Sequence, residues 1–150
     1  MNLPQAQQTS GWAYNTGKDT SILATTIWNA NGNVMTNADI RFNRDNYIFG
    51  DTTLDGNIYE DNTEKTIVDL QTVALHELGH VLGLGHAIHE EDSVMYPTMN
   101  IGPDASNPNY DTGVSSTKRS LSACDINRVQ HIYAGVELKN IFYGQIFKFP

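Results

Sequence analysis

The sequence predicts an α+β fold, in which strands come first along the chain and two helices follow. Between residues 21 and 50, short runs rich in β-branched and aromatic residues are separated by Asn and Gly, which is typical of strands and tight turns. From residue 69 onward, two segments place apolar residues three and four positions apart, as amphipathic helices do. Strands followed by helices favour the α+β class.

The first half of the chain has the character of a β-meander. Residues 1–20 are polar and interrupted by glycine, which predicts a loop with at most one short strand around residues 12–14. The turn signal Asn-Ala-Asn-Gly-Asn at residues 29–33 separates the first strands from the next. The predicted strands are residues 22–23, 25–28, 38–42 and 47–49.

The first long helix is predicted to begin at Asp69 and to run through Leu82. Aspartate is a favoured N-cap residue, and the glycines at 83 and 85 are suited to end a helix. Residues 50–65 before this helix are predicted to be an acidic loop. Residues 86–121 after it are rich in Pro, Asn, Asp, Gly and Ser. A structureless segment of that length is usually functional, for example as the wall of a binding site.

The second long helix is predicted to begin at Ser122, because Ser122 and Asp125 have the spacing of a capping box. Gly135 is expected to end it. The aromatic tail, residues 141–149, is expected to pack back as a strand or an apolar clasp. The buried stripe of this helix comprises Ile126, Val129, Ile132 and Tyr133.

Composition excludes several classes of function. The chain has 150 residues, the size of one domain, with 9 Lys and Arg against 17 Asp and Glu. A net charge of -8 argues against nucleic acid and an anionic membrane surface as partners. No apolar run approaches the roughly 20 residues of a membrane-spanning helix, so we expect a soluble protein. Cys124 is the single cysteine, which excludes an internal disulfide and a cysteine-based zinc site.

The chemistry is concentrated in residues 76–86, His-Glu-Leu-Gly-His-Val-Leu-Gly-Leu-Gly-His. On a helix, His76 and His80 lie one turn apart on the same face, as two ligands of one Zn²⁺ must. Glu77 is then placed to act as general base on a water held by the metal. Gly83 tolerates the positive φ of a sharp helix end, which lets His86 return as the third ligand and leaves a fourth position open.

This spacing is specific. The extended pattern HExxHxxGxxH followed by a Met-turn is the metzincin signature, and residues 93–97, Ser-Val-Met-Tyr-Pro, are similar to a Met-turn. The chain resembles the metzincin zinc endopeptidases and, within them, the matrixins. The segments that carry the likeness are 69–75, 94–97 and 121–127, together with Tyr133 and Gly135, and a looser likeness at 32–34 and 38–40 suggests bacterial matrixins.

The resemblance implies a zincin/metzincin-like fold over one catalytic domain, residues 1–150. It implies a twisted, mostly antiparallel β-sheet with an active-site helix and a C-terminal helix flanking a zinc cleft. Residues 1–86 would form the upper part and 87–150 the lower part with the Met-turn. It also implies a secreted, monomeric zinc endopeptidase that hydrolyses peptide bonds of a protein or peptide substrate. Met95 would lie beneath the zinc imidazoles, and the substrate pocket would include Tyr96, Pro97 and Met99.

Some features depart from the matrixin pattern. No histidine precedes His76, so the second, structural zinc of animal matrixins is expected to be absent. Cys124 stands where matrixins usually have an acidic residue, and it is expected to be inert and partly buried. Residues 51–56 match an EF-hand loop only in part, so a calcium site there is the weaker alternative to a solvated turn. His89 and His131 are expected to be solvated or half-buried.

Two alternatives stay open at this point. The polar N-terminus lacks a signal peptide, so the protein is either cytosolic or shown here without a removed leader. The function that competes with proteolysis is a non-cleaving or latent zinc-binding module that grips a protein partner. An intact Glu77 disfavours this alternative, because a module that does not cleave has no chemical need for a general base.

Overall fold

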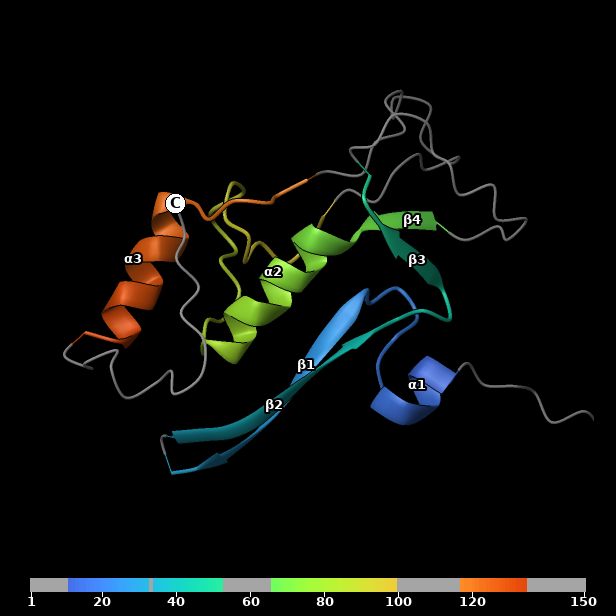
Figure 1. Cartoon of the computed structure of the whole chain (residues 1–150), viewed down its shortest axis with the longest axis horizontal. Helices are drawn as coiled ribbons and strands as arrows, with labels where there is room; N and C mark the ends of the chain where they lie inside the picture. The colour runs from blue at the N-terminus through green and yellow to red at the C-terminus, as the bar shows by residue number, and fades with distance from the viewer. Residues whose placement is uncertain (1–10, 33, 53–65, 100–116, 135–150) are drawn as a thin grey trace, which may run out of the picture.

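The computed structural model describes residues 11–32, 34–52, 66–99 and 117–134. Helix α2 lies at the centre, with the hairpin β1–β2 along one side and α3 on the other (Figure 1). Strands followed by two long helices agree with the predicted α+β class. None of the described helices is both long and apolar enough to cross a bilayer. The elements are α1 (Gly11–Thr16), β1 (Ala24–Asn31), β2 (Val34–Phe42), β3 (Tyr47–Gly50), β4 (Thr66–Asp69), α2 (Leu70–Val81) and α3 (Ala123–Ile132).

Strands β1 and β2 form an antiparallel hairpin that is longer than the sequence predicts. Its register runs from Ala24 opposite Phe42 to Asn31 opposite Val34, with an irregularity between residues 29 and 30. The predicted turn at 29–33 shrinks to the end of the hairpin, where Gly32 has a φ of +61°. Only a residue that tolerates this conformation lets two strands reverse so tightly.

The sheet arrangement differs from the single, mostly antiparallel sheet that was predicted. Among the described residues there are two two-stranded sheets, and β3 pairs with β4 in parallel, from Tyr47 opposite Thr66 to Gly50 opposite Asp69. Parallel strands need a long connection, which residues 51–65 supply. The sequence pattern missed β4 because it has four residues and continues directly into α2, too few for any periodicity to be visible.

The prediction of a loop or short strand around residues 12–14 is wrong, because these residues lie in helix α1. The amide of Trp12 donates to the Asp45 carboxylate at 2.6 Å, and its indole N–H donates to the carbonyl of Asp19 at 2.9 Å. The Trp12 side chain is buried. These contacts come from residues up to 33 positions away, so no local sequence pattern predicts them.

Helix α2 has the bounds that its local signals predict. The carboxylate of Asp69 accepts from an amide of the first turn at 2.8 Å, as an N-cap does. At the other end, Gly83 has a φ of +84° and its amide donates to His80, while the Leu84 amide donates to Gly79, both at 2.9 Å. This pair of bonds is a Schellman motif, and it turns the chain sharply after the second histidine.

Helix α3 begins with the predicted capping box, in which Ser122 and Asp125 bond each other's backbone amides. Its last helical residue is Ile132, and Tyr133 is the C-cap. Gly135, the tail 141–149 and most of the predicted acidic loop lie outside the described residues.

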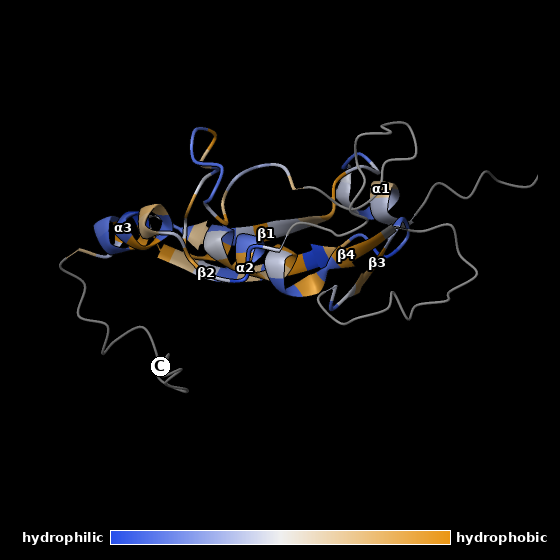
Figure 2. Ribbon diagram, turned by 90° about the horizontal axis from the view of Figure 1, so that it is seen from above, coloured by the Kyte–Doolittle hydropathy of each residue, from blue (hydrophilic) through white to orange (hydrophobic). Residues whose placement is uncertain are grey.

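In the part of the chain that the structure describes, the core has two clusters, and a residue of α2 contributes to each. Coloured by hydropathy, apolar stretches occur in α2 and the strands, beside polar connecting segments (Figure 2). One cluster contains Leu84, Ala87, Val94 and Met95, with Leu75 and Val129 packed against it. The other contains Ala24, Val68 and Val73, with Leu23, Phe42, Tyr47, Phe49 and Met99 packed against it.

An ion pair fastens the segment before α3 to the start of α2. Arg119 bonds the buried carboxylate of Asp69, with its Nε at 3.1 Å, and pairs with Asp51 at 2.5 Å. The adjacent amide of Lys118 donates to the Thr72 hydroxyl at 2.9 Å. Burial by itself would raise the pKa of Asp69, but hydrogen bonds from Arg119 and Thr72 outweigh it and lower this pKa to about 2.

We therefore expect Asp69 to make the folded chain acid-sensitive. Because the folded pKa lies below the unfolded value of 3.8, its stabilisation is complete above pH 3.8 and is lost as the pH falls towards 2. Over this pH window, the contribution of Asp69 to the unfolding free energy should fall by roughly 2 kcal/mol. Urea unfolding of the metal-free chain at a series of pH values should show this loss. Asp69→Asn should be less stable at neutral pH, and its unfolding free energy should change less as the pH falls. If the unfolding free energies of the two chains fell equally with pH, the assignment to Asp69 would be contradicted.

Candidate metal centre

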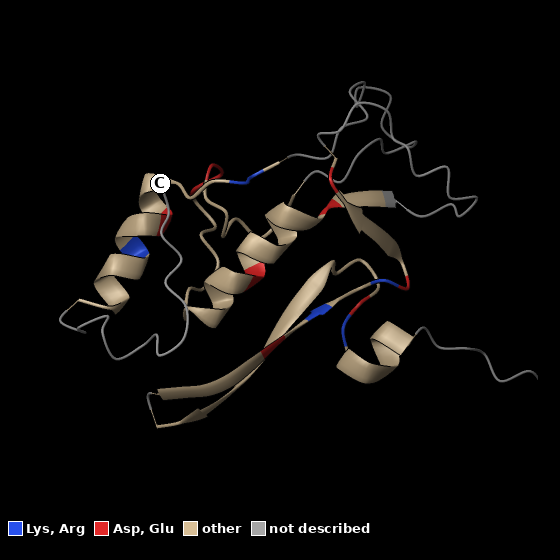
Figure 3. Cartoon of the chain, viewed as in Figure 1, with Lys and Arg blue, Asp and Glu red and all other residues tan. Residues whose placement is uncertain are grey.

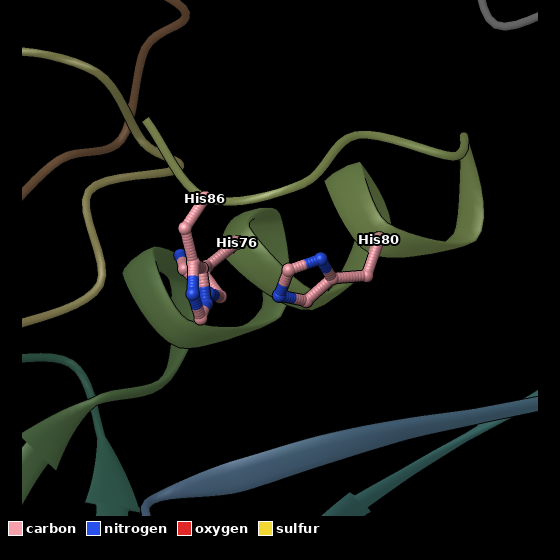
Figure 4. A group of neighbouring side chains, drawn as sticks. All are labelled: His76, His80 and His86. Atoms are coloured by element: carbon pink, nitrogen blue, oxygen red, sulfur yellow. The ribbon is translucent and has the colours of Figure 1, made fainter. Parts of the chain in front are cut away.

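Three imidazoles meet at one point beside α2. His76 and His80 lie one helical turn apart on α2, and His86 returns from the segment after the Gly83 turn (Figure 4). One ring nitrogen of each lies within 4.8 Å of the other two. The ring centroids are 4.8 to 5.2 Å apart. The structure thus brings together the three side chains whose spacing predicted a metal site.

Backbone carbonyls orient two of the rings. The Nδ1 of His76 lies 2.7 Å from the carbonyl oxygen of Val94, and the Nδ1 of His80 lies 2.7 Å from that of Leu84. A carbonyl oxygen only accepts, so each Nδ1 carries the proton and the Nε2 of a neutral ring keeps its lone pair. This is the arrangement that metal-binding histidines have, because the bonded nitrogen fixes both the tautomer and the ring orientation.

Local electrostatics favour the neutral rings of His76 and His86. Burial lowers the pKa of His76, although the bond to the Val94 carbonyl acts in the opposite direction. Desolvation also lowers the pKa of His86, and charge on the neighbouring imidazoles lowers it further. Only the neutral imidazole can bind a metal, so these shifts extend metal binding to lower pH.

The donor set suits a zinc ion. Three neutral imidazole nitrogens at the wall of an open cleft are a ligand set found in catalytic zinc sites, where the fourth position remains available. The cleft has a volume of about 960 Å³ and lies between β1 and α2. The predicted pocket residues Tyr96, Pro97 and Met99 all line it, together with the three histidines.

Glu77 is the one charged residue of α2. Figure 3 shows an acidic position within this helix. Its side chain lines the cleft but is only 4% exposed. The hydroxyl of Thr26 on β1 donates to Glu77 Oε2 at 2.5 Å. Sequence reasoning missed Thr26, because a threonine in a strand 51 residues before the helix carries no local signal of this contact.

Met95 lies directly against the helix that carries the two histidines. It is fully buried, and a Cβ added at Gly79 would come within 2.2 Å of its sulfur. Its carbonyl accepts from the amide of Ala87, the residue after the third histidine, at 2.9 Å. Met95 therefore packs against the helix that carries His76 and His80, and only glycine leaves room for it at position 79.

Substituting Gly79 with alanine is expected to displace Met95 and to lower the unfolding free energy by about 1–3 kcal/mol, as overpacking does. The comparison is Gly85→Ala, because a Cβ there meets nothing within 4 Å. Urea unfolding of both variants measures the difference. Equal stabilities for Gly79→Ala and Gly85→Ala would show that the methionine yields without cost.

Helix α3 is hydrogen-bonded to the Met-turn segment, residues 93–97, through Asp125. The fully buried carboxylate of Asp125 accepts from the hydroxyl of Ser93 and, at 3.1 Å, from the amide of Val94. The carbonyl of this same Val94 is the partner of His76. Asp125 was expected only as part of a capping box, so its second contact, across 31 residues, is a finding of the structure.

Two further side chains, one on α3 and one at its C-cap, bond the turn between the second and third histidines. Arg128 Nη2 donates to the carbonyl of Gly85 at 2.7 Å, and the Tyr133 hydroxyl donates to that of Leu82 at 3.1 Å. Gly85 directly precedes His86, so Arg128 restrains the third histidine through the backbone. Of the predicted buried stripe, Val129 and Tyr133 are half-buried, but Ile126 and Ile132 are exposed, so the prediction is wrong for these two. The role of Arg128 had no signal in the sequence.

The remaining candidate residues are not among those that line the cleft. His89 and His131 are exposed and Cys124 is half-buried, as expected. Residues 53–56 of the weak calcium candidate lie outside the described residues, and the carboxylate of Asp51 pairs with Arg119.

Comparison with known proteins identifies a family and several relatives to which this chain is similar. The sequence model of the family described as Matrixin matches residues 6–134. The chain is similar to metalloendoproteinase 5-MMP of Arabidopsis thaliana, 40% identical over 70 residues, and to 2-MMP of the same plant, 41% identical over 66 residues. It is also similar to matrilysin of Rattus norvegicus, 38% identical over 84 residues.

These alignments are partial. They cover 47%, 44% and 56% of this chain but 16%, 14% and 27% of the three relatives, so the chain spans a minor part of each. No solved structure matches the chain significantly. The family match nevertheless covers α1 to α3, including the whole histidine centre. The chain belongs to the matrixin family.

Proposed function

We propose that this chain is a zinc-dependent endopeptidase in which His76, His80 and His86 hold the metal and Glu77 is the general base. One observation carries the proposal. In a chain of the matrixin family, three imidazoles with converging nitrogens and a carboxylate on the same helix line one cleft. Met95 supports this helix from the side of the core.

Each residue then has a defined task. When bound, zinc polarises the scissile carbonyl and makes a water acidic enough to be activated at neutral pH. Glu77 takes a proton from the attacking water as the water oxygen bonds to the carbonyl carbon. It then gives the proton to the amide nitrogen as the C–N bond breaks, which yields one carboxylic acid and one amine. The backbone bonds of His76 and His80 keep these rings oriented throughout.

The cleft is large enough for a stretch of polypeptide, and Tyr96, Pro97 and Met99 would contact a substrate side chain. The cleft wall also includes the apolar residues Leu23 and Trp28. We extend the proposal to a protein or peptide substrate and to action outside the cell. Two further points remain predictions from the family resemblance. They are a monomeric state and a single catalytic domain whose upper part ends near residue 86.

Digestion of casein or gelatin, with and without a zinc chelator, tests the proposal. We expect fragments that disappear with the chelator and return on addition of zinc. Stoichiometric capture of the protein without fragments would instead support a non-cleaving module that binds a partner. Metal analysis of the purified protein after reconstitution is the companion measurement, because a chain that retains no divalent ion would overturn the assignment.

A further inference from the structure

The hydrogen bond between Thr26 and Glu77 joins two elements that are remote in sequence. Thr26 Oγ1 lies 2.5 Å from Glu77 Oε2 and 3.1 Å from the backbone oxygen of the same residue. Thr26 is half-buried on β1 and lines the cleft. Within the described parts of the chain, it is the side chain that hydrogen-bonds this carboxylate.

The two acceptors are not equivalent. A threonine hydroxyl has one proton to donate, and a charged oxygen at the shorter distance takes it in preference to a neutral carbonyl. A separation of 2.5 Å is that of a short, charge-assisted bond. Oε2 is therefore committed to Thr26, and Oε1 is the oxygen left to accept a proton in the cleft.

The strand gives this contact a fixed geometry. Thr26 pairs with Ile40 within the β1–β2 register, so its position is set by the hairpin rather than by α2. Glu77 is 4% exposed, and neighbouring atoms restrict its side chain further. A general base gains from such restraint, because a misplacement of about 1 Å can cost roughly 10²-fold in rate.

We propose that Thr26 is a positioning residue for Glu77, holding one carboxylate oxygen so that the other receives the proton of the attacking water. This inference rests on the proposed role of Glu77. It adds a residue from the first strand to a machinery that the sequence motif confines to residues 76–86. It predicts an effect on turnover, with little effect on the binding of metal or substrate.

The test compares Thr26→Val, which removes the hydroxyl at nearly the same volume, with Thr26→Ser, which keeps it. For the zinc-loaded chain we expect kcat to fall about 10- to 100-fold in the valine variant, as loss of a partner beside a metal site does. KM and zinc content should stay near the wild-type values, and serine should restore most of the rate. Thr36→Val, the same change at an exposed site on β2, should leave kcat unchanged.

A further comparison separates positioning from general damage. In a Glu77→Gln background, Thr26→Val should lower the residual rate by less than about twofold, because the group it orients is gone. A wild-type kcat in Thr26→Val, or equal losses in the valine and serine variants, would overturn the inference while leaving the proposed function intact. The inference would also be overturned if Thr26→Val lowered kcat by the same factor in the Glu77→Gln background as in the wild type. A wild-type chain that cleaves nothing would overturn the proposed function itself.

Discussion

Replacing Glu77 with glutamine is expected to lower kcat for peptide cleavage by about 10²- to 10⁴-fold while the zinc content stays unchanged. Glutamine has the size of glutamate and its oxygen can still accept from Thr26, but it cannot take a proton from water. His76 and His80 keep their backbone contacts and none of the three histidines is changed, so the metal should remain. Peptide cleavage rates and metal analysis of the same preparation measure both quantities.

The matched control is Glu90→Gln, an exposed glutamate in the loop after the third histidine, which should cleave as fast as the wild type. Near-normal turnover in Glu77→Gln would remove Glu77 from the mechanism. Loss of zinc together with activity would make it a support of the metal centre rather than a base. The proposed chemistry requires the remaining outcome, a chain that is loaded with metal and slow.

Asp125→Ala is expected to have the largest effect on stability among substitutions outside the histidine motif. The carboxylate is fully buried and accepts from the amides of Val94 and Ser122 and from the hydroxyls of Ser93 and Ser122. Alanine leaves these donors without a partner, and unsatisfied buried groups cost about 1–3 kcal/mol each. We expect the unfolding free energy to fall by about 3 kcal/mol or more.

The same substitution should weaken zinc binding, because the Val94 segment that Asp125 holds carries the carbonyl partner of His76. A loss of about 10- to 100-fold in zinc affinity is expected. Asp125→Asn is the matched comparison, since its amide oxygen can still accept from the donors at Oδ2, and it should lose less of both properties. Urea unfolding of the metal-free chain and chelator competition for zinc separate the two effects. If Asp125→Ala lost stability but kept full zinc affinity, the link to His76 would be disproved.

Local patterns predicted the long helices well, because their signals lie within a few residues of what they determine. Asp69 caps α2 through an amide three residues on, and Gly83 ends it with a positive φ. Ser122 and Asp125 form their capping box across the same short separation. The histidine triad follows from the helix and its sharp end, since two ligands share a helix face and the third lies three residues beyond Gly83.

Two short elements were missed by the sequence patterns, although the short strand β3 was predicted. Helix α1 and strand β4 have six and four residues, and their own propensities are too weak to determine a structure without tertiary contacts. The amide of Trp12 is held by Asp45, and β4 gains its hydrogen bonds from β3. The pairing of strands into two sheets likewise depends on which edges meet, a property that no window along the chain contains.

The amino-acid sequence by itself determined the two long helices α2 and α3, the spacing of His76, His80 and His86, and the place of Glu77 beside them, because each depends on helical geometry over a few residues. Tertiary structure alone decided what surrounds these groups. Thr26 reaches Glu77 across 51 residues, Asp125 reaches Val94 across 31, and Arg119 reaches Asp69 across 50. Such contacts depend on how strands, helices and loops pack in space, and packing brings side chains together at sequence separations to which no periodicity extends.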